Sequence, residues 1–135
     1  MADTTPGGLE EAVDEFFAAS EAGDWKRAGK VIAEHAVLWQ NADGVERPFI
    51  DALPRLSRMY AALGPWTYSD VRRVVGPDAV CEQHTVTFSH PGAPDVTADV
   101  CVVLRFGEDG RITRLEEYLD SAAVASLGQK EEAHR

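Results

Sequence analysis

A single carboxylate stands between two large apolar side chains near the end of the chain. Residues 111–120 are predicted to form a strand, in which Leu115, Glu117 and Leu119 share one face. Burying an unpaired charge is costly, so a glutamate in this position is expected to be paired, protonated or chemically active. The pattern leaves open a structural ion pair, a local twist that exposes Glu117, and a role in proton transfer.

The bulk composition narrows the class of protein and of partner. With 135 residues, the chain is predicted to form one domain, 8–127, between a disordered N-terminus, 1–7, and a frayed tail, 128–135. Thirteen basic and 23 acidic residues give a net charge of −10, which argues against nucleic acid or an anionic membrane as a partner. Because no export signal or membrane-length apolar run is visible, we expect a cytoplasmic protein.

The hydrophobic spacing changes from helical to strand-like along the chain. Helices are predicted from Leu9 to near Gly23, over 25–32 behind an Asp24 N-cap, and over 52–63 behind an Asp51 N-cap. A short strand is predicted at 36–41. Four further strands, at 66–75, 79–89, 96–106 and 111–120, are joined by short turns, which favours an antiparallel meander.

This order of elements predicts an α+β domain, with three N-terminal helices on one face of a curved, mainly antiparallel sheet. Several strands, such as 100–104, are apolar on both faces. The back of the sheet is therefore expected to be covered by a second copy of the chain in a homodimer. No element carries metal-ligand spacing of His, Cys or acidic residues, so neither a metal nor a cofactor is expected.

Three segments resemble the nuclear transport factor 2-like superfamily when they are taken in this order. They are AASEAGDW at 18–25, EHAV at 34–37 and DGRITRLEEYLD at 109–120. That group includes SnoaL-like polyketide cyclases, ketosteroid isomerases and limonene-epoxide hydrolases. The resemblance implies a cone-shaped pocket between the helices and the concave face of the sheet, in a fold that hosts many chemistries and some proteins that are not enzymes.

The resemblance also assigns residues to that pocket. Glu117 corresponds to the acid on the last strand that SnoaL-like cyclases use as a general acid/base. Trp39 and Asn41 fall in a Trp-Gln-Asn run similar to the Tyr-Gln-Asn of limonene-epoxide hydrolases, so Asn41 is implied to orient a water or substrate oxygen. Gln83 and Thr85 occupy the places of the Arg and the second Asp of those hydrolases and are expected to supply polar contacts.

The same register bears on the remaining candidates. Phe16 corresponds to the Tyr of the ketosteroid isomerases, and the position of their base is held by Gln40, which cannot abstract a proton. Phe16, Trp39 and Tyr60 are expected to shape the pocket wall. His84 and Glu82 are expected to face the back of the sheet, as a pair buried in the interface.

The resemblance implies a SnoaL-like, cofactor-free acid/base enzyme of the cyclase, isomerase, dehydratase or hydrolase type. Its substrate is expected to be a small hydrophobic oxygenated molecule, with Glu117 as the proton-transfer group. A non-catalytic ligand-binding or dimeric assembly module is the first alternative. The second is an epoxide hydrolase with a diverged catalytic set, which requires another acid near Glu117 that the predicted register does not provide.

Overall fold

The computed structural model describes residues 6–120, 122 and 123. The helices are α1 (Pro6–Ala22), α2 (Trp25–Gly29) and α3 (Phe49–Leu63). The strands are β1 (Ile32–Gln40), β2 (Val45–Pro48), β3 (Trp66–Val75), β4 (Ala79–Phe88), β5 (Val96–Phe106) and β6 (Ile112–Leu119). The predicted tail at 128–135 lies outside the described residues. Of the predicted disordered segment 1–7, residues 1–5 also lie outside them, and residues 6 and 7 belong to α1.

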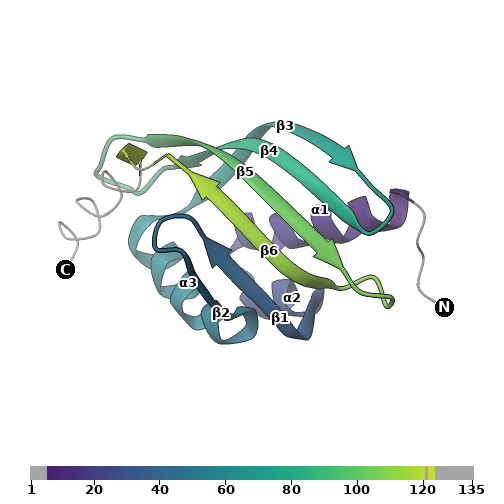
Figure 1. Ribbon diagram of the computed structural model, residues 1–135. Coiled ribbons are helices and arrows are strands. Elements are labelled where there is room, and N and C mark those ends of the chain that lie inside the picture. The colour runs from purple at the N-terminus through teal and green to yellow at the C-terminus, as the bar shows by residue number, and fades with distance from the viewer. Residues whose placement is uncertain (1–5, 121, 124–135) are drawn as a thin grey trace.

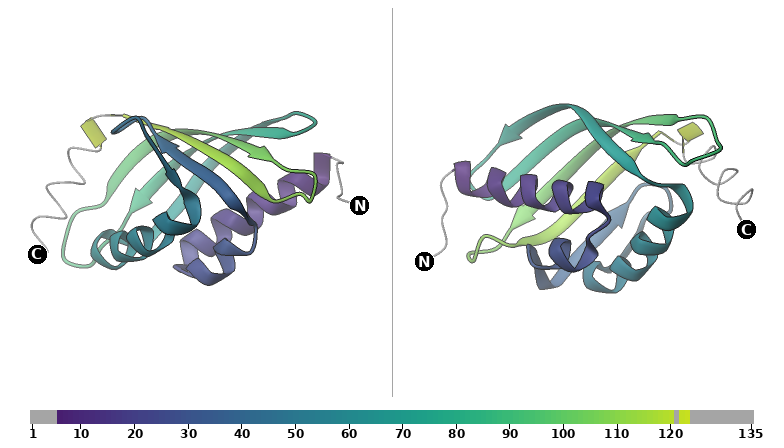
Figure 2. Two further views of the ribbon diagram at one scale, coloured as in Figure 1. Left: turned by 60° about the horizontal axis from the view of Figure 1, so that its bottom comes forward. Right: turned by 180° about the vertical axis from the view of Figure 1, so that it is seen from behind.

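The six strands form one open mixed sheet in the order β2-β1-β6-β5-β4-β3 (Figure 1). Neighbouring strands are antiparallel except β1 and β6, which pair in parallel. All three helices lie on one side of the curved sheet (Figure 2). We call the helix-covered side the inner face and the other side the outer face. The predicted α+β layout is confirmed, while neither β2 nor the parallel pairing of β1 with β6 was predicted.

The helix starts follow two different local rules. Asp24 caps α2 as predicted, since its side chain accepts a hydrogen bond from the backbone N–H of Arg27 at 3.0 Å. The predicted Asp51 cap of α3 is wrong, because α3 begins at Phe49 with Pro48 in the N-cap position. Pro48 ends β2 with φ −59°, and buried Phe49 anchors the first turn in the core. Asp51 therefore lies inside that first turn, where a carboxylate still favours a helix N-terminus.

An extra residue in β3 changes which side chains point inwards. Ser69 pairs with Thr85, but the next pair is Arg72 with Gln83, so β3 holds one more residue than β4 over this interval. Asp70 sits in this bulge with φ 53°. Tyr68 before the bulge and Arg73 after it consequently both lie on the inner face, although they are five positions apart.

The core fills the space between the helices and the inner face. It includes Val13 and Phe17 from α1, Phe49 from α3, and Val102 and Leu104 from β5. Within the described residues, no helix combines the length and the apolar character needed to cross a bilayer. The core is not completely filled, because a cavity remains between α1, α3 and the middle strands.

Candidate functional site

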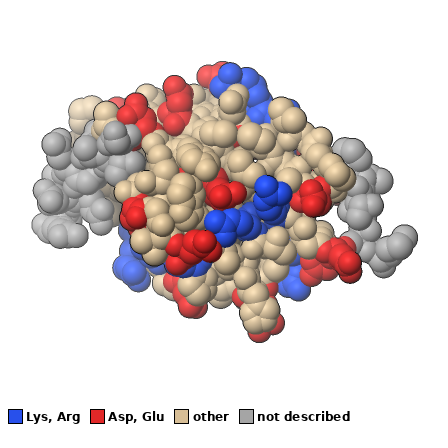
Figure 3. All heavy atoms as spheres, in the orientation of Figure 1, with Lys and Arg blue, Asp and Glu red and all other residues tan. Residues whose placement is uncertain are grey.

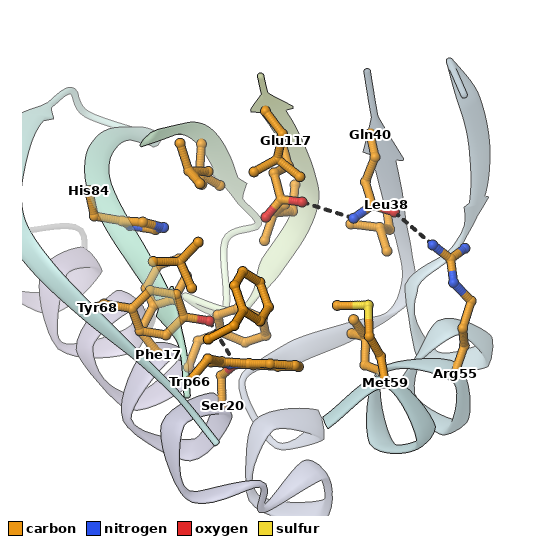
Figure 4. Close-up of a pocket in the computed structure, with 18 of the residues that line it drawn as sticks. Phe17, Ser20, Leu38, Gln40, Arg55, Met59, Trp66, Tyr68, His84 and Glu117 are labelled. Atoms are coloured by element: carbon orange, nitrogen blue, oxygen red, sulfur yellow. Dashed lines mark hydrogen bonds between the residues drawn. The ribbon is translucent and has the colours of Figure 1, made fainter. Parts of the chain in front are cut away.

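The cavity has a volume of about 260 Å³ and mostly apolar walls (Figure 4). Helices α1 and α3 and strands β1, β3, β4, β5 and β6 all contribute lining residues. The apolar lining includes Phe16, Phe17, Leu38, Phe49, Trp66 and Val102. A small number of polar side chains enters this surface, and they determine what the cavity can do chemically.

Glu117 projects from β6 into the cavity, between Leu115 and Leu119, which line it as well. Burial raises the pKa of its carboxyl, an effect opposed by a hydrogen bond from Gln40 and by the charges of His84 and Arg55. The protonated form of Glu117 is therefore favoured compared with a glutamate in water. A carboxyl of this kind can donate a proton to a bound molecule and take one back.

Gln40 holds one oxygen of Glu117 in a fixed direction. Arg55 Nη2 donates to Gln40 Oε1 at 3.3 Å, and Gln40 Nε2 donates to Glu117 Oε1 at 2.9 Å. Because a guanidinium can only donate, the amide oxygen of Gln40 must face Arg55 and its NH₂ must face Glu117. In the neutral carboxyl, the proton therefore sits on Glu117 Oε2, the oxygen that Gln40 leaves unbound.

A second ionisable side chain, His84 from β4, reaches the same cavity. Its Nδ1 lies 2.5 Å from Glu82 Oε2, and both residues are almost completely buried. Arg73 Nε donates to the other oxygen of Glu82 at 2.7 Å. Since a carboxylate only accepts, Nδ1 is the nitrogen of His84 that donates to it. In an imidazole with one hydrogen, the lone pair is then on Nε2.

Arg73 ties this pair to the first helix. Its guanidinium also bonds Asp14 of α1 at 2.7 Å and lies 3.6 Å from Glu10. Glu82 is thus fixed from both sides, by Arg73 and by His84. Phe17 packs edge-on against the His84 ring at 5.1 Å between centroids, which further restricts its orientation.

The α1 side of the cavity carries a hydroxyl pair. Tyr68 and Ser20 are hydrogen-bonded at 2.8 Å, and Trp66 Nε1 donates to the same Ser20 oxygen at 3.0 Å. Burial raises the pKa of Tyr68, so its phenol stays neutral. The pair offers a polar contact in a wall that is otherwise aromatic.

The structure brings only two of the predicted site residues to the cavity. Glu117 and Phe16 line it. Asn41 instead bonds the backbone of Leu119 through both ends of its amide, at 3.0 and 2.9 Å, and is exposed. Trp39 lies on the outer face, where its ring packs 5.2 Å from Tyr118. The predicted inward orientation of Trp39 and Asn41 is corrected, because Leu38 and Gln40 occupy the inner face of β1.

The predicted faces of β4 are also reversed. Gln83 and Thr85 point outwards and border a separate hollow, and Thr85 Oγ1 bonds Asp99 at 3.0 Å there. Glu82 and His84, predicted at the back, are on the inner face. The sequence of β4 could have predicted this orientation, since Glu82 and His84 share a strand face with the apolar Val80, Val86 and Phe88. A one-residue error in the register taken from the resemblance exchanged the two faces.

Tyr60 lies behind the wall and does not form part of it. Its hydroxyl donates to the backbone carbonyl of Glu21 at 2.7 Å, and its ring packs 4.9 Å from Trp66. Gly23 leaves the space that this ring needs, because a Cβ built there would lie 2.7 Å from it. Tyr60 therefore supports Trp66, which does line the cavity.

Sequence reasoning did not identify Gln40, Arg55 or His84 as site residues. Arg55 gave no local signal, because an exposed arginine on an amphipathic helix is ordinary. As for metals, the described residues hold no group of three or more His, Cys, Asp or Glu side chains suited to a cation. Glu117 and His84, which both line the cavity, are side chains that can exchange protons with a bound molecule.

Comparison with solved structures identifies the fold. An NTF2-like protein from Burkholderia xenovorans superposes with a TM-score of 0.76 at 19% identity, covering 93% of this chain and 98% of its own. A candidate polyketide cyclase from Xanthomonas campestris pv. campestris gives 0.75 at 16% identity, covering 93% and 98%. An LEH-like epoxide hydrolase from M. tuberculosis gives 0.73 at 22% identity, covering 96% and 92%. At these identities the similarity concerns the fold alone.

Sequence comparison adds the family. Curated proteins yield no significant match. The family model described as the SnoaL-like domain matches residues 13–115, which run from the middle of α1 into β6. The chain therefore belongs to the SnoaL-like domain family, within the NTF2-like fold.

Proposed function

We propose that the protein is a cofactor-free acid/base enzyme that acts on a small hydrophobic oxygenated molecule by cyclisation, isomerisation, dehydration or hydrolysis. One observation carries the proposal. The buried Glu117 carboxyl and the Glu82-oriented His84 enter the same apolar cavity, from β6 and β4 (Figure 4). Two groups of different acidity around one enclosed space are what a concerted proton transfer requires.

The two side chains are given complementary roles. His84 Nε2 takes a proton from the substrate, either from a carbon next to a carbonyl or from a water, and the imidazolium that forms is stabilised by Glu82. Glu117 Oε2 donates its proton to the substrate oxygen on which negative charge develops, while Gln40 stabilises the carboxylate left behind. To complete the cycle, the His84 imidazolium gives its proton to a different atom of the intermediate or to solvent. Glu117 regains a proton from the intermediate or from solvent, so both groups return to their resting state and no cofactor is consumed.

The surroundings of Glu117 favour this role over that of a non-catalytic module. In such a module we would expect a filled core and a salt-bridged or solvated carboxylate. The cavity holds about 260 Å³ of space, and the Glu117 side chain accepts a hydrogen bond from the neutral amide of Gln40. Burial raises the pKa of this carboxyl in spite of the nearby charges, which suits proton exchange and not structural pairing.

Epoxide opening is one reaction within this proposal. It requires one group to activate water and another to protonate the leaving oxygen. Among the described residues that line the cavity, Glu117 is the one carboxylate, so the second acid of the hydrolase alternative is missing. His84 would have to activate the water.

We also propose that the outer face forms a homodimer interface, in a cytoplasmic protein. The outer face carries the packed rings of Trp39 and Tyr118, and Val74 is 75% exposed at the β3 edge. Figure 3 shows this side of the molecule, where uncharged surface surrounds a central group of basic and acidic side chains. Arg114 belongs to this face and pairs there with Glu46 and Glu116.

The decisive experiment compares Glu117→Gln with Glu116→Gln. The two variants carry the same substitution at adjacent positions on opposite faces of β6. Purified variants are incubated in D₂O with a panel of hydrophobic ketones and epoxides, and deuterium incorporation and diol formation are followed by NMR. We expect wild type and Glu116→Gln to turn over the same compounds and Glu117→Gln to be inactive. Retained activity in Glu117→Gln would remove Glu117 from the mechanism.

A further inference from the structure

The cavity opens at one end, between the β1–β2 turn and α3. Most of its lining residues are buried or half-buried, whereas Ala42 in the turn and Arg55 on α3 are exposed. Solvent therefore reaches the cavity beside these two residues, and we call this opening the mouth. Figure 4 shows Arg55 and His84 on opposite sides of the cavity, with Glu117 and Gln40 between them. A molecule entering at the mouth passes Arg55 before it reaches the two ionisable groups.

Arg55 is a cation that the surrounding protein leaves without a countercharge. Its hydrogen bond to Gln40 Oε1 is long at 3.3 Å and joins it to a neutral amide. Asp43, a carboxylate on which Arg55 acts electrostatically, is bound by Arg47 at 2.6 Å and also by the backbone N–H of Val45. Within the described chain, Arg55 forms no salt bridge, and it is the one arginine that lines the cavity.

The second arginine of this corner also has spare donor capacity. Arg47 Nη1 is buried and has no hydrogen-bond partner. Asp43 thus balances one of the two guanidinium groups near it, and Arg55 also acts electrostatically on that same carboxylate. Two guanidinium groups thus share the Asp43 carboxylate, and the one that lines the cavity, Arg55, is the one without a salt bridge to it.

From this juxtaposition we propose that the natural ligand is a hydrophobic carboxylic acid whose carboxylate docks on Arg55 at the mouth. This inference rests on the proposed function, because it names the substrate class of the same site. The planar fork of a guanidinium matches two carboxylate oxygens, and the pairing is stronger than a bond to a neutral amide. The ligand carboxylate takes the place of Gln40 Oε1 on Arg55, while Gln40 Nε2 stays on Glu117.

The apolar lining determines the remainder of the ligand. At the interior packing density of about 0.75, a cavity of about 260 Å³ accommodates about 195 Å³ of ligand, roughly the size of a bicyclic aromatic acid. Phe16, Leu38 and Met59 would contact its body. With the carboxylate anchored at the mouth, the opposite end of such a molecule lies between Glu117 and His84. A phosphate is a poorer fit, since it requires several converging donors and the mouth offers chiefly one fork.

Binding measurements with a matched pair of probes test the inference without any turnover. The probes are 2-naphthylacetate and 2-naphthylacetamide, which have nearly the same shape and differ in charge. Isothermal titration calorimetry is performed on the full chain, on Arg55→Gln and on Arg58→Gln. Arg58 lies one turn further along α3 and does not line the cavity, so its variant carries the same charge change away from the mouth.

We expect wild type and Arg58→Gln to bind the acid at least about tenfold more tightly than the amide, and Arg55→Gln to lose that preference. Equal binding of both probes to wild type would overturn the inference and leave the acid/base proposal intact. If Arg58→Gln lost the preference for the acid to the same extent, the preference would come from the positive charges of α3 in general and not from Arg55. If wild type bound neither probe, this ligand class would be excluded. Conversely, an active Glu117→Gln would overturn the proposed function without affecting the preference for the acid.

Discussion

Replacing Glu117 with Gln should make the folded protein more stable at alkaline pH, although it removes the proposed proton-transfer group. Burial raises the pKa of the Glu117 carboxyl and outweighs the hydrogen bond from Gln40 and the charges of His84 and Arg55. The folded state therefore resists ionising this group, whereas the unfolded chain does not. An amide has nearly the same size and keeps an acceptor oxygen for Gln40, but it cannot ionise.

The sign and size of this difference in stability follow from proton linkage. Below the ordinary glutamate pKa of 4.5, the carboxyl is protonated in both states and its ionisation has no effect on stability. Above it, the unfolded chain releases the proton and the folded state keeps it until its own higher pKa is reached. Across that window, Glu117 lowers the free energy of unfolding by about 1.4 kcal/mol per pH unit. The variant escapes this loss, so its stability relative to wild type should rise with pH and then level off.

Urea unfolding followed by tryptophan fluorescence between pH 4 and 9 measures this difference. Glu116→Gln is the control, because Glu116 lies on the outer face of the same strand and pairs with Arg114 at 3.6 Å. Its stability relative to wild type should not rise in the same window. If Glu117→Gln were destabilised more strongly as pH rises, Glu117 would be an ionised, stabilising group. The structural ion pair considered from the sequence would then be correct, and the reasoning about the cavity would be wrong.

Three further changes test other parts of the site. His84→Gln should lower kcat about 100-fold or more at unchanged circular dichroism, since it removes the proposed base, and near-normal exchange kinetics would contradict that role. Arg73→Met should cost about 3 kcal/mol in urea unfolding, because it leaves the buried Glu82 short of a countercharge. Arg72→Met, at the adjacent position on the outer face of β3, should cost less than about 0.5 kcal/mol, and equal costs would refute the assignment. Tyr118→Glu should dissociate the proposed homodimer in light scattering, unless the interface lies elsewhere.

The inner face of β6 was predicted correctly because three alternate positions of the strand indicate the same face. Leu115 and Leu119 are apolar on either side of Glu117, and alternation in a strand is a strictly local rule. The same rule applied to β4 would have placed Glu82 and His84 inwards with their apolar neighbours. Polar residues were expected in the cavity instead, because Gln83 and Thr85 matched positions in a family with a polar site. The error shows that local hydrophobic alternation was the better guide to orientation on β4.

Other features of the site depend on the pairing of strands that are far apart in the sequence, which the alternation of residues within one strand does not predict. Gln40 meets Glu117 because β1 lies parallel to β6, with these two residues directly opposite one another. They are 77 positions apart in the chain. Arg55 then reaches Gln40 because β2 leads directly into α3, and β2 carried no recognisable strand signal in its four residues, Val45–Pro48. The mouth of the cavity thus arises from a hairpin and a crossover that composition and spacing did not reveal.

The bulge in β3 decides which arginine reaches the buried pair. The sequence Arg-Arg-Val-Val at 72–75 offers two equivalent alternations, either Arg72 with Val74 inwards or Arg73 with Val75. An unbroken ladder continued from Tyr68 and Val86 would place Arg72 opposite Glu82. The additional residue around Asp70 shifts the pairing by one and puts Arg73 there. Arg73 also bonds Asp14, so the same shift connects the orientation of His84 to α1. The base proposed for the reaction is therefore positioned by backbone geometry outside the cavity, which inspection of the cavity lining alone would not reveal.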